Sequence, residues 1–384
     1  MTFNFDEPVN RRDSECVKWH TFEEDVIPMG VADMDFKSPQ PVIEALLCRV
    51  NHGVFGYPNL PEGIEGAVID WLYNRHGWLV SQEDLIFIPG VVPGFNLAAH
   101  AVTRPGDGVI LQTPTYGPFF QVADNADLVQ QEMELTVEKN GQYSIDFDKF
   151  KACMTGRSRV FMLCNPQNPT GRVFRKDELE RLAEICLRNN IIICADEIHS
   201  DLVFSESKHI PIASISPEIS SQTITLIAPS KTFNIAGLHT SVAVIQNEKL
   251  RTKFNSARKG LMGGVNLLGF TAAMAAYQEG LPWLDALMKY LESNRDFLTS
   301  AVNEEIPGIK MAKPEGTYLA WLDCREADLP GRPGKVFRKK AHVGMVDGEW
   351  FGKGGKGFVR LNFGSPRSML QDAVEKMKEA LLKS

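Results

Sequence analysis

The sequence lacks any long hydrophobic run. No stretch reaches the roughly 20 consecutive apolar residues that a membrane-spanning helix requires. The N-terminal residues, from Met1 to Glu7, are acidic and contain no apolar segment of the kind found in a secretory signal peptide. These two absences predict a cytoplasmic protein that has no membrane partner.

An excess of positive charge is missing as well. The 384 residues include 41 Lys and Arg and 48 Asp and Glu, which gives a formal net charge of −7. Proteins that bind nucleic acid need a basic surface for the phosphate groups. The mild acidity therefore argues against nucleic acid as an obligatory partner.

Paired cysteines are also absent. None of the 7 cysteines forms a Cys-x-x-Cys motif, whereas zinc sites and disulfide frameworks usually show regular spacings. Cys164 and Cys194 lie in apolar runs, and Cys48 and Cys186 lie in helical patterns. We therefore predict reduced, structural cysteines and no metal site, as is usual in the cytoplasm.

Short apolar runs and helical patterns alternate through the middle of the chain. With 384 residues and 43% hydrophobic content, the chain is too long for one ordinary core and predicts two domains. Helical patterns cover residues 92–102, 117–126 and 177–189. This alternation predicts an α/β fold with a mostly parallel sheet covered on both faces. The expected strands are residues 85–88, 108–112, 159–163, 191–194, 223–227 and 241–245.

The pattern changes near residue 282. A long amphipathic helix over 282–302 is followed by two strand patterns, at 317–322 and 357–362, and by a terminal helix over 368–382. This order predicts a smaller α+β domain, completed by the N-terminal segment. The predicted division is an N-terminal segment (1–45) that joins the small domain, a large domain (46–282) and a C-terminal small domain (283–384).

Polar residues follow three of the predicted strands. Asn168 lies in the segment NPQNPTG (165–171), Asp196 begins the segment DEIH, and Lys231 stands in SKTFN directly after an apolar run. Ligands of open α/β sheets collect at the carboxyl ends of the strands, so these side chains should converge. A lysine at the end of a buried strand is unusual, because an ammonium group is costly to bury without a partner.

This set of side chains suits pyridoxal 5'-phosphate (PLP). A lysine can hold the cofactor as a Schiff base, and an acid such as Asp196 can keep the pyridine nitrogen protonated. Asn168 suits the ring hydroxyl, and His199 could bond to the ring or to that hydroxyl. The phosphate needs backbone N–H groups at the start of a helix, which Gly90-Val91-Val92 would supply. The residues thus predict a PLP site anchored by Lys231.

Each of these residues also has an ordinary structural interpretation. Lys231 could lie along apolar surface with its ammonium in solvent, and residues 165–171 could be a simple Pro/Gly-rich turn. Asp196 could cap a turn, Tyr116 could be a packing residue, and a histidine such as His199 is more often a hydrogen-bonded core residue. The order of the three strand-end segments favours the cofactor site, because the ordinary explanations would have to coincide three times.

The chain resembles the fold-type I PLP-dependent enzymes, the aspartate aminotransferase superfamily, over nearly its whole length. Within that superfamily it is most similar to the cystathionine β-lyase, or C–S lyase, branch. VADMDF and DEIH are the more telling strings for this branch. The strings that carry the resemblance are VADMDF (31–36), GVFGY (53–57), NPQNPTG (165–171), DEIH (196–199), SKTFN (230–234), AAYQ (275–278) and GFVRLN (357–362).

The resemblance implies a role for each matching residue. Lys231 and Tyr116 would be catalytic: Lys231 would transfer the proton at the substrate Cα, and Tyr116 would stack on the cofactor ring. Tyr57 would reach the active site of the neighbouring subunit, which implies a homodimer. The implied cofactor-binding residues are Lys231, Asp196, Asn168, Tyr116, His199, Val91, Val92, Ser230 and Tyr57. The implied substrate-binding residues are Asn168, Tyr57 and Arg360, whose guanidinium would hold the α-carboxylate.

Two positions depart from the superfamily pattern. The hydroxyl residue usually found three positions before the lysine is Ala228 here, and the phosphate-binding arginine of many aminotransferases is replaced by His239. Both changes predict a weaker phosphate site. They also count mildly against a typical aminotransferase.

The resemblance implies a PLP-dependent lyase for an amino-acid substrate. The expected reaction is α,β-elimination on L-cystathionine or a related cysteine S-conjugate, which gives a thiol, pyruvate and ammonia. An aminotransferase is the alternative, because it would use the same lysine. A third possibility, from another class, is a protein that binds a transcription regulator and has only incidental lyase activity.

Overall fold

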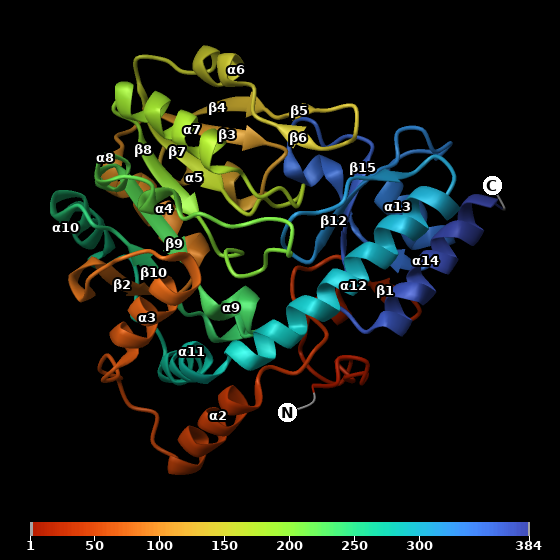
Figure 1. Ribbon diagram of the computed structural model, residues 1–384, viewed down its shortest axis with the longest axis horizontal. Coiled ribbons are helices and arrows are strands. Elements are labelled where there is room, and N and C mark those ends of the chain that lie inside the picture. Colours follow the sequence, from red (N-terminus) through yellow and green to blue (C-terminus); the bar gives the residue numbers. More distant parts are fainter. Residues whose placement is uncertain (1–2, 383–384) are drawn as a thin grey trace.

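The computed structural model describes residues 3–382, and its largest unit is a seven-stranded sheet (Figure 1). The strand order is β2-β10-β9-β8-β7-β3-β4, in which only β10 runs antiparallel to its neighbours. The prediction of an α/β fold with a mostly parallel sheet is confirmed. The strands are β2 (Leu85–Ile88), β3 (Gly108–Thr113), β4 (Val129–Glu134), β7 (Ser158–Cys164), β8 (Ile192–Asp196), β9 (Thr223–Ile227) and β10 (Ser241–Val244).

The two faces of this sheet are covered by separate apolar cores. In β7, Val160 and Met162 belong to the core on one face, while Phe161 and Leu163 belong to the core on the other. This alternation follows from the two-residue period of a strand that is buried on both faces. The first core includes residues of α4 (Val91–Val102), α5 (Pro118–Asn125) and α10 (Glu248–Arg258), and the second includes residues of α6 (Phe147–Ala152) and α7 (Lys176–Arg188).

The edge strand β4 was missed in the sequence. Its residues, VQQEME, are mostly polar, and Val129, Gln130 and Glu134 are exposed. An edge strand that is only half buried does not show the continuous apolar run that marks the inner strands. The predicted strand at 317–322 also begins too early: β12 starts at Leu319, because Thr317 has a φ of 67°, which lies outside the β region.

The C-terminal part of the chain forms a second, antiparallel sheet. Its order is β11-β12-β15-β14, and α12, α13 and α14 belong to the same part of the chain. The N-terminal segment joins it through β1 (Ile27–Pro28), which pairs with β13 (Val343–Gly344). The domain division at residues 45 and 282 stays a prediction. The elements are β11 (Lys310–Met311), β12 (Leu319–Asp323), β14 (Val346–Asp347), β15 (Phe358–Asn362), α12 (Leu281–Glu305), α13 (Pro333–Lys340) and α14 (Arg367–Leu382).

The remaining elements are short or lie outside the two sheets. The longer helices among them are α2 (Gln40–His52), α3 (Ile64–His76) and α11 (Leu267–Glu279). The short ones are α1 (Val17–His20), β5 (Thr136–Val137), β6 (Tyr143–Ser144), α8 (Pro217–Ser221), α9 (Pro229–Thr232) and the 3₁₀ turns η1 (Gln82–Asp84), η2 (Ile212–Ser214), η3 (Ala236–Leu238) and η4 (Gly348–Phe351).

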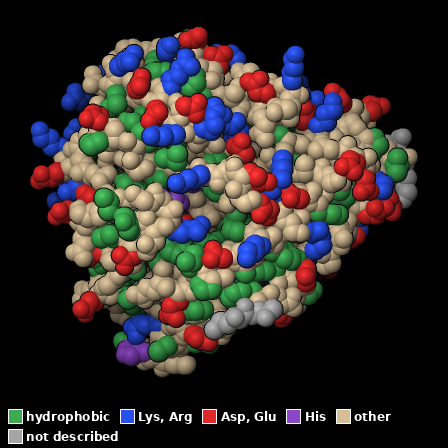
Figure 2. Space-filling view, viewed as in Figure 1, with side chains coloured by type: hydrophobic (Ala, Val, Ile, Leu, Met, Phe, Trp, Pro, Cys, Tyr) green, Lys and Arg blue, Asp and Glu red, His purple; other side chains and the backbone are tan. Residues whose placement is uncertain are grey.

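Charges of both signs are mixed on the visible face of the molecule (Figure 2). On the face shown in Figure 2, acidic and basic side chains are interspersed. Within residues 3–382, no helix has both the length and the apolar composition needed to cross a bilayer.

Candidate active site

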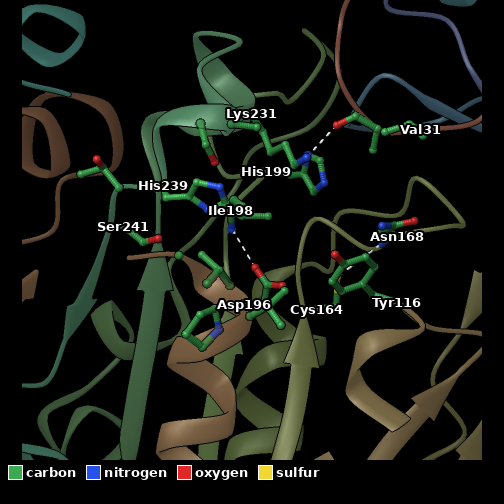
Figure 3. A pocket seen from close by; sticks show the side chains of 18 of the residues that line it. Val31, Tyr116, Cys164, Asn168, Asp196, Ile198, His199, Lys231, His239 and Ser241 are labelled. Carbon is green, nitrogen blue, oxygen red and sulfur yellow. Dashed lines mark hydrogen bonds between the residues drawn. The ribbon is translucent and has the colours of Figure 1, made fainter. Parts of the chain in front are cut away.

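A cavity of about 560 Å³ lies where the carboxyl ends of β7, β8 and β9 meet (Figure 3). It is lined by nine of the ten residues that the sequence predicted for the site; the exception is Tyr57. Segments far apart in the sequence therefore converge here, as expected for a mostly parallel sheet. The nine residues are Val91, Val92, Tyr116, Asn168, Asp196, His199, Ser230, Lys231 and Arg360.

Lys231 enters the cavity from α9, the single helical turn that follows β9. Its Nζ donates a hydrogen bond to the carbonyl oxygen of Ala32 at 2.6 Å. Burial lowers the pKa of Lys231 to about 8, with the charge of Asp33 opposing this shift and that of Arg360 adding to it. An amine with such a pKa is partly neutral near neutral pH, as a nucleophile or a proton acceptor must be.

Asp196 is the last residue of β8 and is only 3% exposed. Its Oδ1 accepts a hydrogen bond from the Ile198 N–H at 3.1 Å. Burial raises the pKa of Asp196 to about 7, although that hydrogen bond and the charge of Lys231 lower it. A carboxylate held in this way favours a cation opposite it, since a nearby positive charge stabilises the ionised form.

His199 and Tyr116 present groups that are uncharged at neutral pH. Burial and the positive charges of Lys231 and Arg360 lower the pKa of His199 to about 3. Its Nδ1 is buried and has no hydrogen-bond partner within the described residues. Burial and the charge of Asp196 raise the pKa of Tyr116 to about 12, so its hydroxyl keeps its proton. Both side chains can therefore bond to a polar ligand without adding charge.

Arg360 in β15 is brought against Asn168 of the large sheet. Its Nη1 donates to Asn168 Oδ1 at 3.0 Å, and its Nη2 donates to the Gly30 carbonyl oxygen at 2.8 Å. The guanidinium carbon lies 5.1 Å from the centre of the Phe351 ring. Its Nε is buried and has no hydrogen-bond partner among residues 3–382. The guanidinium thus has a donor left for an anionic group such as a carboxylate.

We predict that Arg360→Lys raises the KM for an amino-acid substrate more than it lowers kcat. Lysine cannot reproduce the two-pronged geometry of a guanidinium. The loss of one charge-assisted hydrogen bond, about 1.5–3 kcal/mol, corresponds to a KM higher by about 10- to 100-fold. Steady-state kinetics measure the change, with the exposed Arg188→Lys as the control. An unchanged KM would mean that Arg360 does not bind the substrate.

The first turn of α4 supplies backbone donors to one side of the cavity. The N-cap is Gly90, whose φ of 129° suits glycine, and Gly90, Val91 and Val92 all line the cavity. The first N–H groups of a helix have no acceptor within the helix, so they are available to an anion. This arrangement fits a phosphate group.

The structure adds Ser241, which the sequence interpretation missed. Its hydroxyl is buried in the cavity lining and has no partner within the described chain, and Figure 3 shows it on the same side as His239. Ser241 was missed because β10 is antiparallel. Its first residue therefore lies at the edge where the parallel strands end. Ser241 can compensate in part for the missing hydroxyl at Ala228, which precedes α9.

The cavity also contains residues from both ends of the chain that were not predicted as site residues. Val31 and Ala32 come from the N-terminal segment. Val346 and Trp350 come from the C-terminal part, and the Trp350 ring packs edge-to-face against Tyr116 with centroids 5.9 Å apart. The string VADMDF was the one available signal, because it contains two of these residues.

Tyr57 lies outside this cavity. It is fully exposed in the loop between α2 and α3, and it lines a different hollow with Val265 and Asn266. The same loop exposes Val54 and Phe55. A single chain therefore does not bring Tyr57 to its own site.

The residues present fit PLP. The cavity offers a lysine of lowered pKa, a buried acid and the N–H groups of a helix start. It also offers the Ser241 hydroxyl and the His199 Nδ1, which have no hydrogen-bond partner among residues 3–382. These groups match the aldehyde, pyridine nitrogen, phosphate and ring substituents of that cofactor. The fold and the site together define a PLP-dependent enzyme of fold type I.

Comparison with known proteins identifies the family. Residues 24–377 match the family "Aminotransferase class I and II". The chain is 41% identical to the cystathionine beta-lyase PatB of Bacillus subtilis, over 98% of this chain and 100% of the relative. Two PLP-containing crystal structures cover 100% of both chains: cystalysin of Treponema denticola (34% identity, TM-score 0.95) and a C–S lyase of Staphylococcus hominis (35%, 0.94). This chain belongs to the class I and II aminotransferase family, and its cofactor is PLP.

Proposed function

We propose that this protein is a PLP-dependent carbon–sulfur β-lyase. It would act by α,β-elimination on L-cystathionine or a related cysteine S-conjugate, releasing a thiol, pyruvate and ammonia. The observation that carries this proposal is the full-length similarity to proteins named cystathionine beta-lyase and C–S lyase, in a chain whose cavity holds Lys231, Asp196 and Arg360 together. The place of action is proposed to be the cytoplasm.

Each residue would contribute a defined step. PLP, when bound, withdraws electrons from the Cα of the amino acid. Arg360 would hold the α-carboxylate, and the Lys231 amine, with its pKa near 8, would take the Cα proton. Tyr116 keeps its proton at neutral pH, so it can donate that proton to the sulfur as the Cβ–S bond breaks; Lys231 is the other possible donor. Water then converts the remaining fragment into pyruvate and ammonia.

The test is to supply the purified holoenzyme with L-cystathionine and no keto acid. A β-lyase should release pyruvate steadily over many turnovers, because the elimination regenerates the starting form of the enzyme. An aminotransferase is the other candidate, since the family model that the chain matches is that of the class I and II aminotransferases. Turnover that appears only after a keto acid is added would overturn the lyase proposal.

Tyr57 is proposed to act in the neighbouring subunit of a homodimer. The support is its full exposure next to exposed Val54 and Phe55, a hydrophobic loop of the kind that protein interfaces bury. In a symmetric dimer each chain would give its Tyr57 to its partner's site.

This arrangement predicts complementation between two defective variants. Tyr57→Ala and Lys231→Ala should each be nearly inactive alone. After unfolding and refolding as an equal mixture, half of the dimers are hybrids with one intact site, so roughly a quarter of the wild-type activity should return. The control is each variant refolded by itself. A mixture that forms hybrids but recovers no activity would contradict the shared site.

A further inference from the structure

Residues 30–36, which we call the strap, belong to neither a helix nor a strand. Val31 and Ala32 of the strap line the cavity directly. Since the strap has no regular sheet partner at these residues, its position depends on the groups that bind its backbone. Those groups are mostly side chains.

Two strap carbonyl groups hold the two cations of the site. The Ala32 carbonyl oxygen accepts hydrogen bonds from Lys231 Nζ at 2.6 Å and from the Tyr318 hydroxyl at 2.9 Å. The Gly30 carbonyl oxygen accepts from Arg360 Nη2 at 2.8 Å. The places of the amine and of the guanidinium therefore both depend on where the strap lies.

Two asparagines, the buried Asn362 and the half-buried Asn234, also bind the strap backbone. Asn362 Nδ2 donates to the carbonyl oxygens of Val31 and Asp33, both at 2.6 Å. Asn234 accepts from the Met34 N–H at 3.0 Å and donates to the Met34 and Phe36 carbonyl oxygens at 2.9 and 2.8 Å. These bonds fix the backbone of the strap. The carboxylates of Asp33 and Asp35 need partners of their own.

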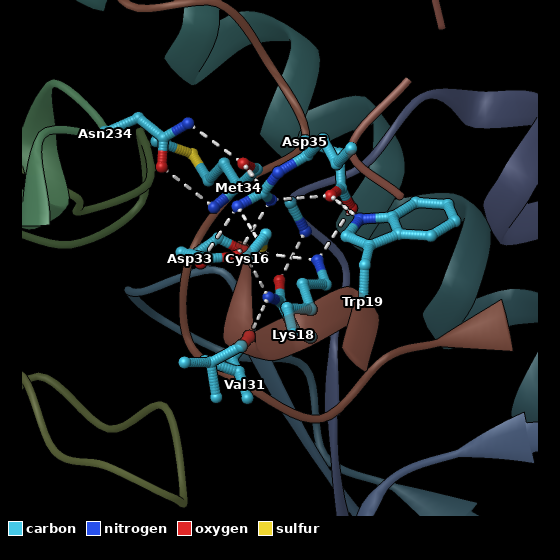
Figure 4. Close-up of polar contacts among 12 residues, drawn as sticks. Cys16, Lys18, Trp19, Val31, Asp33, Met34, Asp35 and Asn234 are labelled. Carbon is cyan, nitrogen blue, oxygen red and sulfur yellow. Dashed lines mark hydrogen bonds and ion pairs between the residues drawn. The ribbon is translucent and has the colours of Figure 1, made fainter. Parts of the chain in front are cut away.

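The two strap carboxylates, Asp33 and Asp35, form an ion cluster with Arg11 and Lys18 (Figure 4). Arg11 lies 3.0 Å from Asp33 and 2.8 Å from Asp35, and Lys18 Nζ lies 2.6 Å from Asp35. The Trp19 indole also donates to Asp35, at 2.8 Å. Lys18 is fully buried and Asp35 is 2% exposed. None of the four lines the cavity.

A buried ion cluster adds little net stability, because the cost of desolvation offsets the attraction between the charges. A different arrangement would leave a buried charge without its partner, and such a charge is costly, so the cluster opposes movement of the residues that carry it. Here the geometry that it fixes is that of the strap. The strap in turn binds Lys231 and Arg360, so the cluster is better explained by the positions of these two side chains than by a contribution to folding stability.

We infer that Lys18 and Asp35 are positioning residues for the amino-acid site: they fix the strap so that its Ala32 and Gly30 carbonyls hold the Lys231 amine and the Arg360 guanidinium in place. They touch neither cofactor nor substrate. The inference rests on the proposed function for the role of the amine and the guanidinium, but the placement of Lys231 can be measured without any reaction.

The first test measures the pKa of Lys231 in the apoprotein. Competitive acetylation across a pH series, read by mass spectrometry of the Lys231 peptide, gives that pKa for Lys18→Met and Asp35→Asn. In both variants we expect it to fall by about one unit, the effect of one lost hydrogen bond to a charged donor. Of the other charges that face Lys231, those of Arg360 and Asp196 are retained, whereas Asp33 belongs to the strap and moves with it, which lowers the pKa of Lys231 further. Trp19→Phe, a milder change that removes one donor to Asp35, should lower it by less.

Two controls separate positioning from folding. Lys37→Met breaks an exposed ion pair with Glu7 beside the strap and should change nothing. Arg251→Met breaks the ion pair with Asp84, near the end of β10 that lies away from Ser241. It should lower Tm without moving the Lys231 pKa. If Lys18→Met and Asp35→Asn likewise lower only Tm, the cluster is merely structural and the inference is wrong.

The second test uses the holoenzyme with L-cystathionine. A displaced strap removes the Gly30 anchor of Arg360, so KM should rise by about tenfold in Asp35→Asn, the size of one such hydrogen bond. Unchanged KM and kcat with a normal Lys231 pKa would overturn the inference. Absence of pyruvate release from the wild type would instead overturn the proposed function, and the apoprotein measurement would still decide the role of the strap.

Discussion

Lys231→Ala should abolish pyruvate release from L-cystathionine. Proton transfer by a positioned side chain contributes about 10²–10⁴-fold to a rate, and this variant also loses the covalent attachment of the cofactor. The place of the amine supports both roles: Lys231 lies in α9, the turn that follows β9, faces the cavity and has a pKa lowered to about 8 by burial. A coupled assay for pyruvate measures the loss.

The control is Lys253→Ala, on the exposed face of α10, which should leave turnover unchanged. Borohydride reduction of the wild-type holoenzyme, followed by peptide mapping, should place the cofactor on Lys231. Turnover within tenfold of the wild type in Lys231→Ala would show that another group does the chemistry. Cofactor attached to a different lysine would have the same meaning.

Most of the large sheet could be predicted from the sequence because its inner strands are buried on both faces. Such strands appear as short apolar runs, and β9 has the predicted bounds of residues 223–227. The polar edge strand β4 gave no such signal. Strands that are buried on both faces were therefore predictable from their apolar residues. The edge strand was not, because its solvent-exposed positions carry polar residues.

The site shows the same division between local and non-local signals. Asp196 ends a parallel strand, and Asn168 and Lys231 follow the ends of two others, so strand direction alone brought them together. Ser241 required knowledge that β10 is antiparallel. The bond from Lys231 to Ala32 joins residues 199 positions apart, and it depends on how the N-terminal segment docks. No periodicity or motif specifies that contact, although it decides where the amine lies.

Asp196→Asn should lower turnover by roughly 10²- to 10⁴-fold. An amide cannot balance a protonated pyridine nitrogen, and breaking a buried ion pair by neutralising one partner costs about 3–5 kcal/mol, which corresponds to that range of rates. The same variant should also bind PLP less tightly. Steady-state kinetics and equilibrium dialysis with PLP measure the two effects. Turnover close to that of the wild type would remove Asp196 from the cofactor site.

The apoprotein of Asp196→Asn should nevertheless be more stable than the wild type above neutral pH. Burial raises the pKa of Asp196 from 3.8 to about 7 in the folded chain, so the folded state binds the proton more tightly than the unfolded state. Stability then falls as the pH rises from about 4 to about 7, by as much as about 4 kcal/mol. An asparagine does not titrate and escapes this loss.

The measurement is the difference in unfolding free energy between the two apoproteins at pH 5 and pH 8. That difference should favour Asp196→Asn more strongly at pH 8. Asp84→Asn is the matched control, and it should lower the unfolding free energy. Asp84 is likewise buried, at 7% exposed, but its carboxylate has an ionic partner in Arg251 at 3.1 Å, which the substitution removes. Loss of stability in both variants would mean that the charge of Asp196 already has a stabilising partner within the protein. A gain only in Asp196→Asn would show that its charge is kept for a cation that the folded chain does not contain.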